Sequence, residues 1–275
     1  MITNILNMVN KEIRDAWQNR WFLSFTLIFT GLAFGLSLLG FSGLGTFGVA
    51  GFGRTSASLI NLVIMIVPLM ALLLGSISIS GERERGTLIS LLAQPVTPAE
   101  IVIGKFLGTA ISLIAAILIG FGLSGLVVAW HSGLAQIRSY FSLIGLTLLL
   151  GLTHLSFGFF ISVVTSRVAT ALSISLISWL TIVLISDLGL IGTSLVLRLS
   201  PSILLWLVLV NPVQVFKLAA IEILRGNLEL LGGAGMYASD VFSDHLLILL
   251  LSLLVGSILL PLVFSIGLFS KRSIQ

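Results

Sequence analysis

The strongest constraint in this sequence is a series of apolar runs that are long enough to cross a lipid bilayer as helices. A spanning helix needs about 20 mostly apolar residues, because the hydrocarbon layer is roughly 30 Å thick and each helical residue rises about 1.5 Å. Six runs of this length lie at approximately Trp21 to Gly40, Leu59 to Ser80, Lys105 to Trp130, Tyr140 to Thr165, Thr170 to Ile191 and Leu246 to Ser270. The sequence therefore predicts an all-α integral membrane protein with six transmembrane helices in a single domain, residues 1–275.

The composition supports a membrane environment. Hydrophobic residues make up 57% of the chain and charged residues only 9%, whereas a soluble globular domain carries about 25% charged residues. A chain with so few charges cannot cover its surface with groups that water solvates. Lipid is therefore expected to be its main solvent.

The lysines and arginines predict the orientation, because cytoplasmic loops carry an excess of these residues. The excess favours both termini in the cytoplasm, so we expect a multi-pass protein of the cell inner membrane. The basic residues lie beside apolar runs rather than in one stripe, which gives no indication of a nucleic-acid partner. In this orientation the inner positions are Lys11, Arg14, Arg20, Arg83, Arg85, Lys105, Arg167, Lys271 and Arg272, and the outer ones are Arg54, Arg138, Arg198, Lys217 and Arg225.

Residues 1–20 have the pattern of an amphipathic helix that lies in the membrane interface. We expect this helix to enter the first span through an elbow; a lead-in without a function of its own fits the same pattern. Its apolar positions are Ile2, Ile5, Leu6, Val9, Ile13 and Trp17, and its polar positions include Asn7, Lys11, Arg14 and Gln18.

The predicted cytoplasmic segment 81–104 begins with Gly81-Glu82-Arg83-Glu84-Arg85-Gly86-Thr87-Leu88. Further along, Thr97-Pro98-Ala99-Glu100 has the spacing of a capping box, in which a threonine and a glutamate satisfy the first N–H groups of a helix. Between these motifs, Leu88, Leu91 and Leu92 give a short helix an apolar face. This face could rest on lipid or on a partner protein.

The predicted outer segment 193–245 is apolar but contains no full span. Ile203 to Val210 is too short, Asn211-Pro212 interrupts it, and an amphipathic helix marked by Val213, Phe216, Ala220 and Leu224 follows. These helices could bind an external partner or pack back on the bundle. An additional span over Leu188 to Val210 is disfavoured, because Arg198 and Pro201 interrupt it and Lys271 and Arg272 would then lie outside.

Several chemistries find no support in the sequence. The chain has no cysteine, and no G-x-x-x-x-G-K-[ST] segment that could cradle phosphates. The histidines at 131, 154 and 245 are far apart, so no metal site is predicted. Met65 and Met70 could contribute to a copper path, although ordinary packing explains them better. We expect no catalysis, no metal and no cofactor in this chain.

A few intramembrane residues are notable. Asp187 is the one acid inside a predicted span; it is a functional candidate, although a structural role near the outer surface explains it better. Pro68 predicts a kink in the second span. Gly31 with Gly35, and Gly104 with Gly108, form small-xxx-small faces that could pack two helices of this chain or form a dimer seam.

The order of these features resembles the type-2 ABC transporter permeases over essentially the whole chain. Within that family the chain is most similar to the permeases of nitrous-oxide reductase maturation, chiefly through Asp187 and the Asn-Pro outer helix. The segments that carry the resemblance are Lys11-Glu12-Ile13-Arg14, Asn19-Arg20-Trp21, Pro68 to Leu74, Gly81 to Leu88, Gly104-Lys105-Phe106, Asp187-Leu188 and Asn211-Pro212.

The resemblance implies a homodimer bound to two cytoplasmic ATPase subunits, which use the ATP. It implies a coupling helix within Glu82 to Leu92 and a periplasmic partner seated on the outer segment, the whole serving assembly of copper centres. We expect Glu82, Glu84 and Arg85 to contact the ATPase, and Asn211, Pro212 and Phe216 to form the outer partner surface. The full set of expected coupling residues is Glu82, Arg83, Glu84, Arg85, Gly86, Thr87, Leu88, Leu91 and Leu92.

Two alternatives remain open from the residues. One is an exporter permease for a lipid, a drug or a glycan, which would share the same ATPase architecture. The other is a secondary transporter that works alone, which would need intramembrane charges to carry coupling ions. Asp187 is its only support in the sequence.

Overall fold

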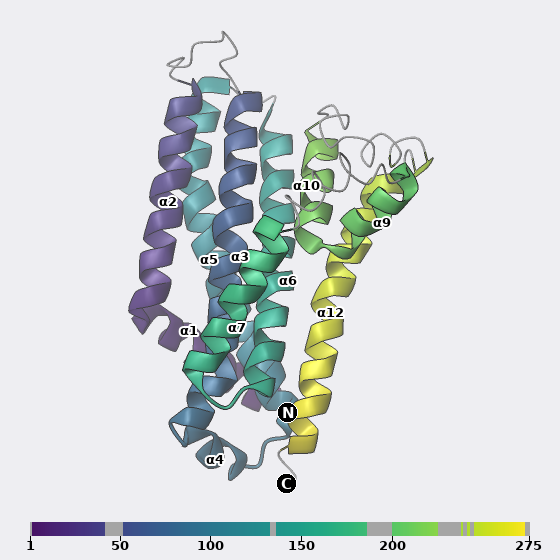
Figure 1. Ribbon diagram of the computed structural model, residues 1–275. Helices are drawn as coiled ribbons and strands as arrows, with labels where there is room; N and C mark the ends of the chain where they lie inside the picture. The colour runs from purple at the N-terminus through teal and green to yellow at the C-terminus, as the bar shows by residue number, and fades with distance from the viewer. Residues whose placement is uncertain are drawn as a thin grey trace.

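A computed structural model describes residues 2–41, 52–132, 136–185, 200–224, 238, 241–242 and 245–272 of the 275-residue chain. Within these ranges every regular element is helical (Figure 1). The elements are α1 (Ile2–Gln18), α2 (Arg20–Phe41), α3 (Phe52–Glu84), α4 (Thr87–Leu92), α5 (Pro98–Ser132), α6 (Ile137–Val164), α7 (Val168–Leu180), the π-helical turn η2 (Thr181–Ile185), α9 (Pro201–Val210), α10 (Pro212–Ile223) and α12 (Leu246–Arg272).

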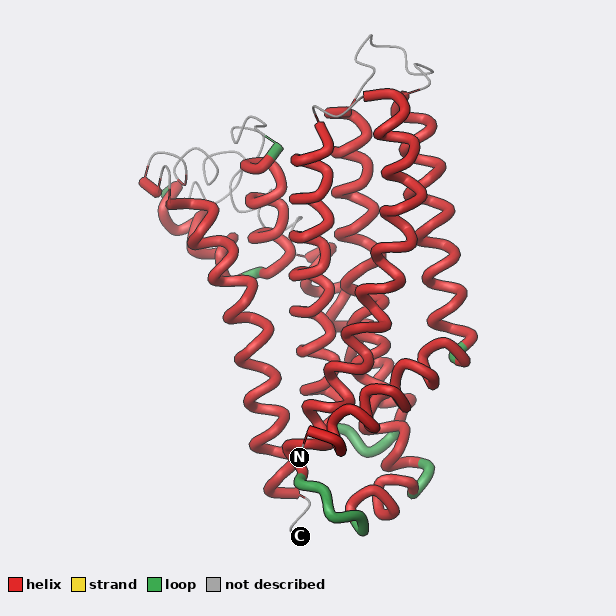
Figure 2. Tube along the Cα trace, turned by 180° about the vertical axis from the view of Figure 1, so that it is seen from behind, coloured by secondary structure: helices red, strands yellow, loops and turns green. Residues whose placement is uncertain are grey.

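The helices form one upright bundle, and both chain termini lie at the same end as the short helix α4 (Figures 1 and 2). We refer to this end as the α4 end. Among the described residues five helices, α2, α3, α5, α6 and α12, are long and apolar enough to cross a membrane. The all-α membrane fold expected from the apolar runs is therefore confirmed.

The fifth predicted span, Thr170 to Ile191, corresponds to α7 and η2, which continue one another from Val168 to Ile185. Residues 186–191 lie outside the described ranges, and the part of this helix that is described has a shorter apolar stretch than the five long helices. The π turn leaves the i to i−4 pattern at the far end of α7, so the backbone there is open to partners from other elements.

Helices α9 and α10 form a pair bent by 109° at Asn211, and the two together would count as a sixth span. They lie at the end of the bundle opposite α4 (Figure 1). The bend has a local cause: Asn211 Oδ1 accepts a hydrogen bond from Val213 N at 2.9 Å, and Pro212 occupies the first turn of α10. An asparagine cap followed by a proline is a strong signal for starting a new helix.

The centre of the bundle is the contact between α3 and α6, whose backbones touch. A Cβ atom added at Gly158 would lie 2.6 Å from the carbonyl oxygen of Leu72, and one added at Gly75 would lie 2.5 Å from that of Leu155. Nearer the α4 end, Ser162 Oγ accepts hydrogen bonds from Ile79 N and Ser80 N, both at 2.8 Å. Small residues allow this approach, and dispersion and polar contacts then hold the pair together inside lipid.

Helix α1 lies against α5 rather than entirely in the interface. Gly104 and Gly108 form its seat, because added Cβ atoms there would lie 2.8 Å from Met8 Cβ and 2.6 Å from Glu12 Cβ. This small-xxx-small face therefore packs two helices of one chain. Gly31 and Gly35 on α2 face open space instead, with nothing within 4 Å of an added Cβ.

Helix α1 ends and α2 begins where the sequence predicts an elbow. Only Asn19 separates the two helices, and its Oδ1 accepts a hydrogen bond from Trp21 N at 3.0 Å. On α1, Leu6 and Trp17 remain 55% and 48% exposed, so part of its apolar face is left for lipid.

The close α3–α6 contact predicts that Gly158→Ala destabilises the protein by about 1–3 kcal/mol, because the added methyl group must push the two backbones apart. Gly145→Ala is the matched control: it lies on the same helix α6, and its added Cβ would meet nothing within 4 Å. Thermal unfolding in detergent measures both. Equal unfolding midpoints for the two variants would contradict the contact.

Candidate functional site

The segment from Gly81 to Leu88 occupies the α4 end of α3 and the turn into α4. Gly81 to Glu84 continue α3 instead of beginning a loop, so the helix extends one turn beyond the predicted span. The chain then reverses at Gly86, whose φ of 74° lies in the left-handed region that glycine adopts without steric cost. Each charged side chain of this segment has a different partner.

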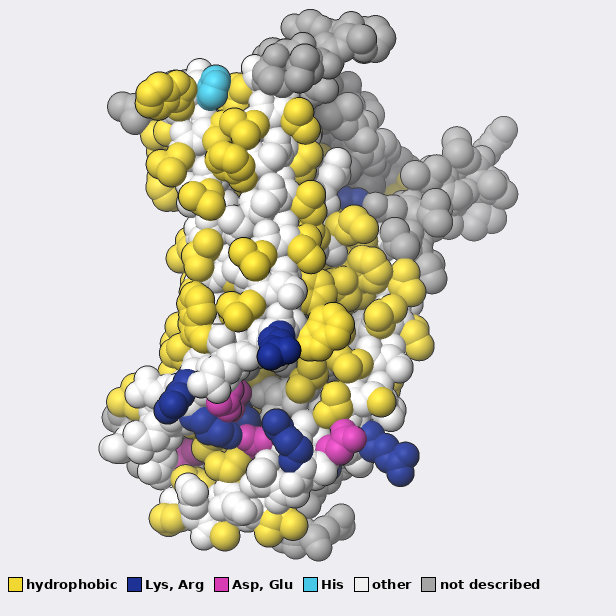
Figure 3. Space-filling model, turned by 90° about the vertical axis from the view of Figure 1, so that its left-hand side faces the viewer, with side chains coloured by type: hydrophobic (Ala, Val, Ile, Leu, Met, Phe, Trp, Pro, Cys, Tyr) yellow, Lys and Arg dark blue, Asp and Glu magenta, His cyan; other side chains and the backbone are white. Residues whose placement is uncertain are grey.

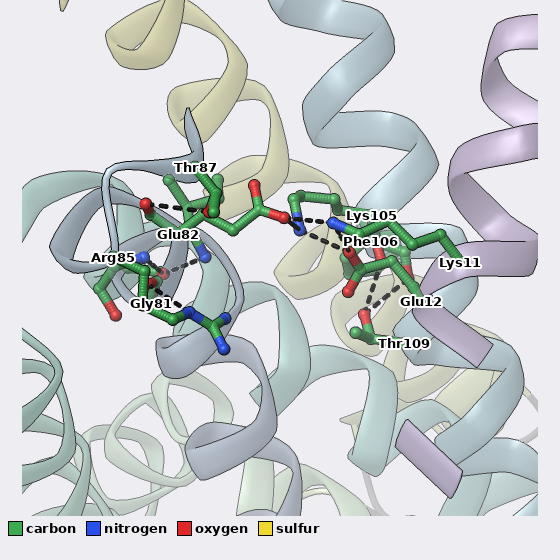
Figure 4. Close-up of polar contacts among 12 residues, drawn as sticks. Lys11, Glu12, Gly81, Glu82, Arg85, Thr87, Lys105, Phe106 and Thr109 are labelled. Carbon is green, nitrogen blue, oxygen red and sulfur yellow. Dashed lines mark hydrogen bonds and ion pairs between the residues drawn. The ribbon is translucent and has the colours of Figure 1, made fainter. Parts of the chain in front are cut away.

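Glu82 belongs to a charge cluster, defined here as Lys11, Glu12, Glu82 and Lys105, of which all but Lys11 are buried (Figure 4). Lys105 Nζ lies 2.5 Å from Glu12 Oε1 and 2.9 Å from Glu82 Oε1. Lys11 Nζ lies 2.5 Å from the same Glu82 oxygen. The cluster joins α1, α3 and α5 at one level near the α4 end.

The burial of this cluster decides its energetic importance. The exposed fractions are 1% for Lys105, 3% for Glu82 and 7% for Glu12. A charge removed from water is tolerated only when opposite charges and hydrogen bonds replace its hydration. Burial lowers the pKa of Lys11, but its hydrogen bond to Glu82 and the neighbouring carboxylates outweigh that effect, so this pKa lies above its ordinary value of 10.5. Lys11 therefore remains charged at neutral pH.

The structure places Glu82 away from the surface. Its side chain points into the bundle. The sequence shows charges along the chain but not the side to which α3 turns them, and the contact of Glu82 with an ATPase stays a prediction.

Arg83 and Glu84 hold the connection between α6 and α7. Arg83 Nη1 donates to the carbonyl oxygens of Val163 and Thr165, at 3.2 and 2.5 Å, where α6 ends. Glu84 Oε2 accepts from Val168 N at 2.6 Å, where α7 begins. A cation at a helix C-terminus and an anion at an N-terminus both satisfy unpaired backbone groups and complement the helix dipole. The end of α3 therefore fixes the turn between the next two helices.

Helix α4 presents a small mixed surface at the tip of the bundle. In the turn before α4, Arg85 folds back on the end of α3, where its Nε donates to Gly81 O at 3.1 Å. Thr87, the first residue of α4, donates from Oγ1 to Glu82 O at 3.3 Å. Leu88 is buried, and Leu91 and Leu92 are half-buried. The predicted apolar face thus packs on this chain.

The opposite side of α4 carries Ile89, which is 75% exposed. Beyond α4 the capping box is confirmed, because Thr97 N donates to Glu100 Oε2 at 2.7 Å and Glu100 N donates to Thr97 Oγ1 at 3.3 Å. The segment therefore has a defined structure between two helices, and Ile89 is a strongly exposed apolar side chain on it.

The residues expected to form the outer partner surface lie inside the bundle instead. Phe216 is fully buried, Pro212 is buried and Asn211 is half-buried. The apolar face of α10 packs against α6 and α12 of its own chain. The pattern was that of an amphipathic helix, and this pattern does not distinguish a partner from the bundle itself. Asp187 lies outside the described residues.

Asn211 has a contact that the sequence did not indicate. Its Nδ2 donates to the carbonyl oxygen of Ile182 at 2.9 Å. Ile182 belongs to the π turn η2 at the end of α7, so Asn211 ties the bend between α9 and α10 to that helix. Glu84 holds the other end of the same helix.

Pro68 is buried in the middle of α3. A proline there supplies no N–H for the carbonyl one turn earlier and loosens the helix. Beside it, the indole Nε1 of Trp179 on α7 donates to Met65 O at 3.0 Å. Met65 is 59% exposed whereas Met70 is 2% exposed, so the two methionines differ in environment.

Sequence reasoning missed three members of the charge cluster as site residues: Lys11, Glu12 and Lys105. A signal was present, because each lies within or next to an apolar stretch in which a free charge is costly. What the sequence could not supply was the pairing, since Lys105 and Glu12 are 93 residues apart.

The cluster predicts unequal effects for its two lysines. Lys105→Met should destabilise the protein by about 3–5 kcal/mol, because two buried carboxylates lose their shared cation. Lys11→Met should cost about 1 kcal/mol or less, because the Lys11 side chain is 46% exposed. Thermal unfolding in detergent compares them, and adding Glu82→Gln to Lys105→Met should recover part of the loss. Similar losses for both lysines would refute the assignment.

Comparison with known proteins places this arrangement in a family. Residues 6–274 match the model of the family described as "ABC-2 family transporter protein". A protein of Pseudomonas aeruginosa called "Probable ABC transporter permease protein NosY" is 34% identical over 277 aligned positions, which cover 98% of this chain and 99% of that protein. Its namesake from Stutzerimonas stutzeri is 34% identical over 238 positions, which cover 84% and 86%. This multi-pass membrane chain therefore belongs to the ABC-2 family of transporter permeases.

Proposed function

We propose that this permease transmits the force of ATP hydrolysis from a separate cytoplasmic ATPase, bound at the α4 end, to the opposite end of the bundle. The observation that carries the proposal is the double attachment of α7. Glu84 holds the first N–H group of this helix, and Asn211 holds a carbonyl of the π turn at its far end. A helix held at both ends carries displacement from one to the other.

ATP hydrolysis is assigned to a partner because this chain has no phosphate-binding loop. The segment Gly104-Lys105-Phe106 lacks both the first glycine and the hydroxyl residue of that motif. In the structure, Lys105 is committed to Glu12 and Glu82. A lysine paired with two buried carboxylates is not available for a phosphate.

The docking surface for the ATPase is the exposed side of α4 with the adjoining Arg85. Ile89 supplies an apolar anchor, and Leu88 beneath it links α4 to the core. A short rigid helix seated on the core transmits a push better than a flexible loop, because little of the displacement is lost in bending.

The path continues through α3. Force on α4 passes across Gly86 to the end of α3, where Arg83 and Glu84 hold the turn between α6 and α7. Helix α7 also contacts α3 beside the proline, through Trp179 and Met65. A tilt of α7 would then reach α9 and α10 through Asn211.

The finer role that we propose is that of the NosY-like permease of nitrous-oxide reductase maturation. The names of the two relatives support it, as does their coverage of nearly the whole chain. In this proposal two copies of the chain form a homodimer with NosF-like ATPase subunits, and a NosD-like periplasmic protein sits at the α9–α10 end. The work serves assembly of the copper centres, and no metal is assigned to this chain.

Affinity purification of the tagged protein in mild detergent tests the assembly. Co-purification of an ATP-hydrolysing subunit with a periplasmic copper-maturation protein is the expected result. An ATPase without that protein would favour an exporter of a lipid, drug or glycan. A stable protein that recovers neither would contradict the proposal and favour a transporter that works alone.

At the docking surface, Ile89→Asp should release the ATPase subunit, because a carboxylate replaces the apolar anchor at the centre of the contact. The measurement is the amount of ATPase that co-purifies, with the stability of the permease checked in parallel. Ser139→Asp is the control, since it adds the same charge in the first turn of α6 at the other end of the bundle. Full retention of the ATPase by Ile89→Asp would exclude α4 as its anchor.

The transmission path predicts that Asn211→Asp leaves ATP hydrolysis by the partner subunit intact but weakens its effect on copper loading. Aspartate keeps the oxygen that caps α10 but loses the N–H that binds Ile182 O. We expect normal ATPase binding and hydrolysis, with copper loading of nitrous-oxide reductase reduced about two- to twelve-fold, as for the loss of a hydrogen bond of about 0.5–1.5 kcal/mol. Copper content of the reductase purified from cells measures the output. Unchanged loading would place the path elsewhere.

A further inference from the structure

A polar cavity of about 400 Å³ lies beside the charge cluster at the α4 end, and an apolar groove of about 530 Å³ lies between α2, α3 and α7. Asn19, Leu74 and Ile77 line both. The two are therefore parts of one site whose polar end lies near the membrane surface and whose apolar end runs along the bundle. Figure 3 shows the corresponding face, where acidic and basic side chains gather in a band next to apolar surface.

Glu82, which lines the polar cavity, has a carboxylate oxygen that lacks a hydrogen-bond partner. Glu82 Oε1 receives both lysines, but Glu82 Oε2 is buried and accepts no hydrogen bond, and Ser78 Oγ beside the same cavity is likewise without one. Buried acceptors are almost always satisfied, because leaving one unpaired costs about 1–3 kcal/mol. An N–H donor inside the cavity would remove this cost.

The remaining lining specifies the charge of that donor. Asp15 adds an exposed carboxylate at the cavity, and Glu12 adds a buried one. Lys105 is shared by Glu12 and Glu82, and Lys11 pairs with Glu82 as well, so the exposed Asp15 is the carboxylate that a further cation would meet. Arg85 also lines it and supplies a positive charge for an anion next to that cation.

We propose that this site binds one phospholipid whose headgroup carries a primary amine next to its phosphate, as in phosphatidylethanolamine. The ammonium group donates to Glu82 and Asp15, the phosphate lies towards Arg85, and an acyl chain occupies the groove between α2, α3 and α7. This binding does not depend on the proposed function.

Other headgroups satisfy the cavity less well. A quaternary ammonium, as in phosphatidylcholine, has no N–H group to donate to Glu82 Oε2. A headgroup with only a phosphate charge, as in phosphatidylglycerol, can donate a hydroxyl hydrogen bond but supplies no cation for Asp15. The primary amine supplies both the donor and the charge.

Native mass spectrometry of the full chain, with any subunits that co-purify, tests the proposal after equilibration with equal amounts of phosphatidylethanolamine, phosphatidylglycerol and phosphatidylcholine. The expected result is a retained phosphatidylethanolamine adduct. Asp15→Asn should lower its retention up to about fivefold, as for an exposed ion pair, and should narrow the preference over the other lipids.

The groove is tested separately with Leu172→Trp, which fills its apolar end. This variant should lose the adduct, whereas Ile177→Trp should keep it, because Ile177 is on the same helix, 62% exposed and outside the groove. Equal retention of the three lipids, preference for phosphatidylglycerol, or equal retention by the two tryptophan variants would overturn the proposal. Loss of a dimer in Leu172→Trp with no lipid bound to the parent protein would assign the groove to a second copy of the chain instead.

Discussion

The charge cluster of Lys11, Glu12, Glu82 and Lys105 is the interaction on which the α4 end of this permease depends. Glu12, Glu82 and Lys105 meet where water is largely excluded, so the two buried carboxylates are tolerable only while their shared lysine remains in place. Lys11 closes the cluster from its exposed side. Buried ion pairs add little net stability over apolar residues of similar volume, but removing one partner is costly because it leaves a buried charge uncompensated. Here they hold α1 on its glycine seat and fix the end of α3 from which the coupling segment continues.

The other contacts divide the bundle into a rigid part and a part held by single bonds. Helices α3 and α6 touch through their backbones at Gly75 and Gly158, which leaves no room for sliding. Helix α7 contacts α3 too, but its ends are held by one carboxylate and one amide, from Glu84 and Asn211. Helix α7 is therefore better suited to move between two positions than α3 or α6. Exchanging one hydrogen bond costs less free energy than separating two helices whose backbones are in contact.

The sequence predicted the features that depend on local spacing. The long apolar runs gave five of the spans, and Thr97 with Glu100 gave the capping box, because both patterns lie within one stretch of chain. Pairings between distant segments were not predictable: the partners of Glu82 lie 71 residues away at Lys11 and on another helix at Lys105. Phe216 illustrates a second limit, since an apolar helical face has the same pattern whether it meets its own bundle or another protein.

The backbone contact between α3 and α6 has a mechanical consequence. Gly75 lies nine positions before the last residue of α3 and 23 positions after the first. At about 1.5 Å per residue, the contact divides this helix into arms of about 14 Å and about 35 Å. A contact that prevents sliding but permits tilting is a fulcrum. A small displacement imposed on the short arm beside α4 would be enlarged about 2.5-fold at the far end of the long arm to the extent that α3 stays straight at Pro68, which lies in the long arm.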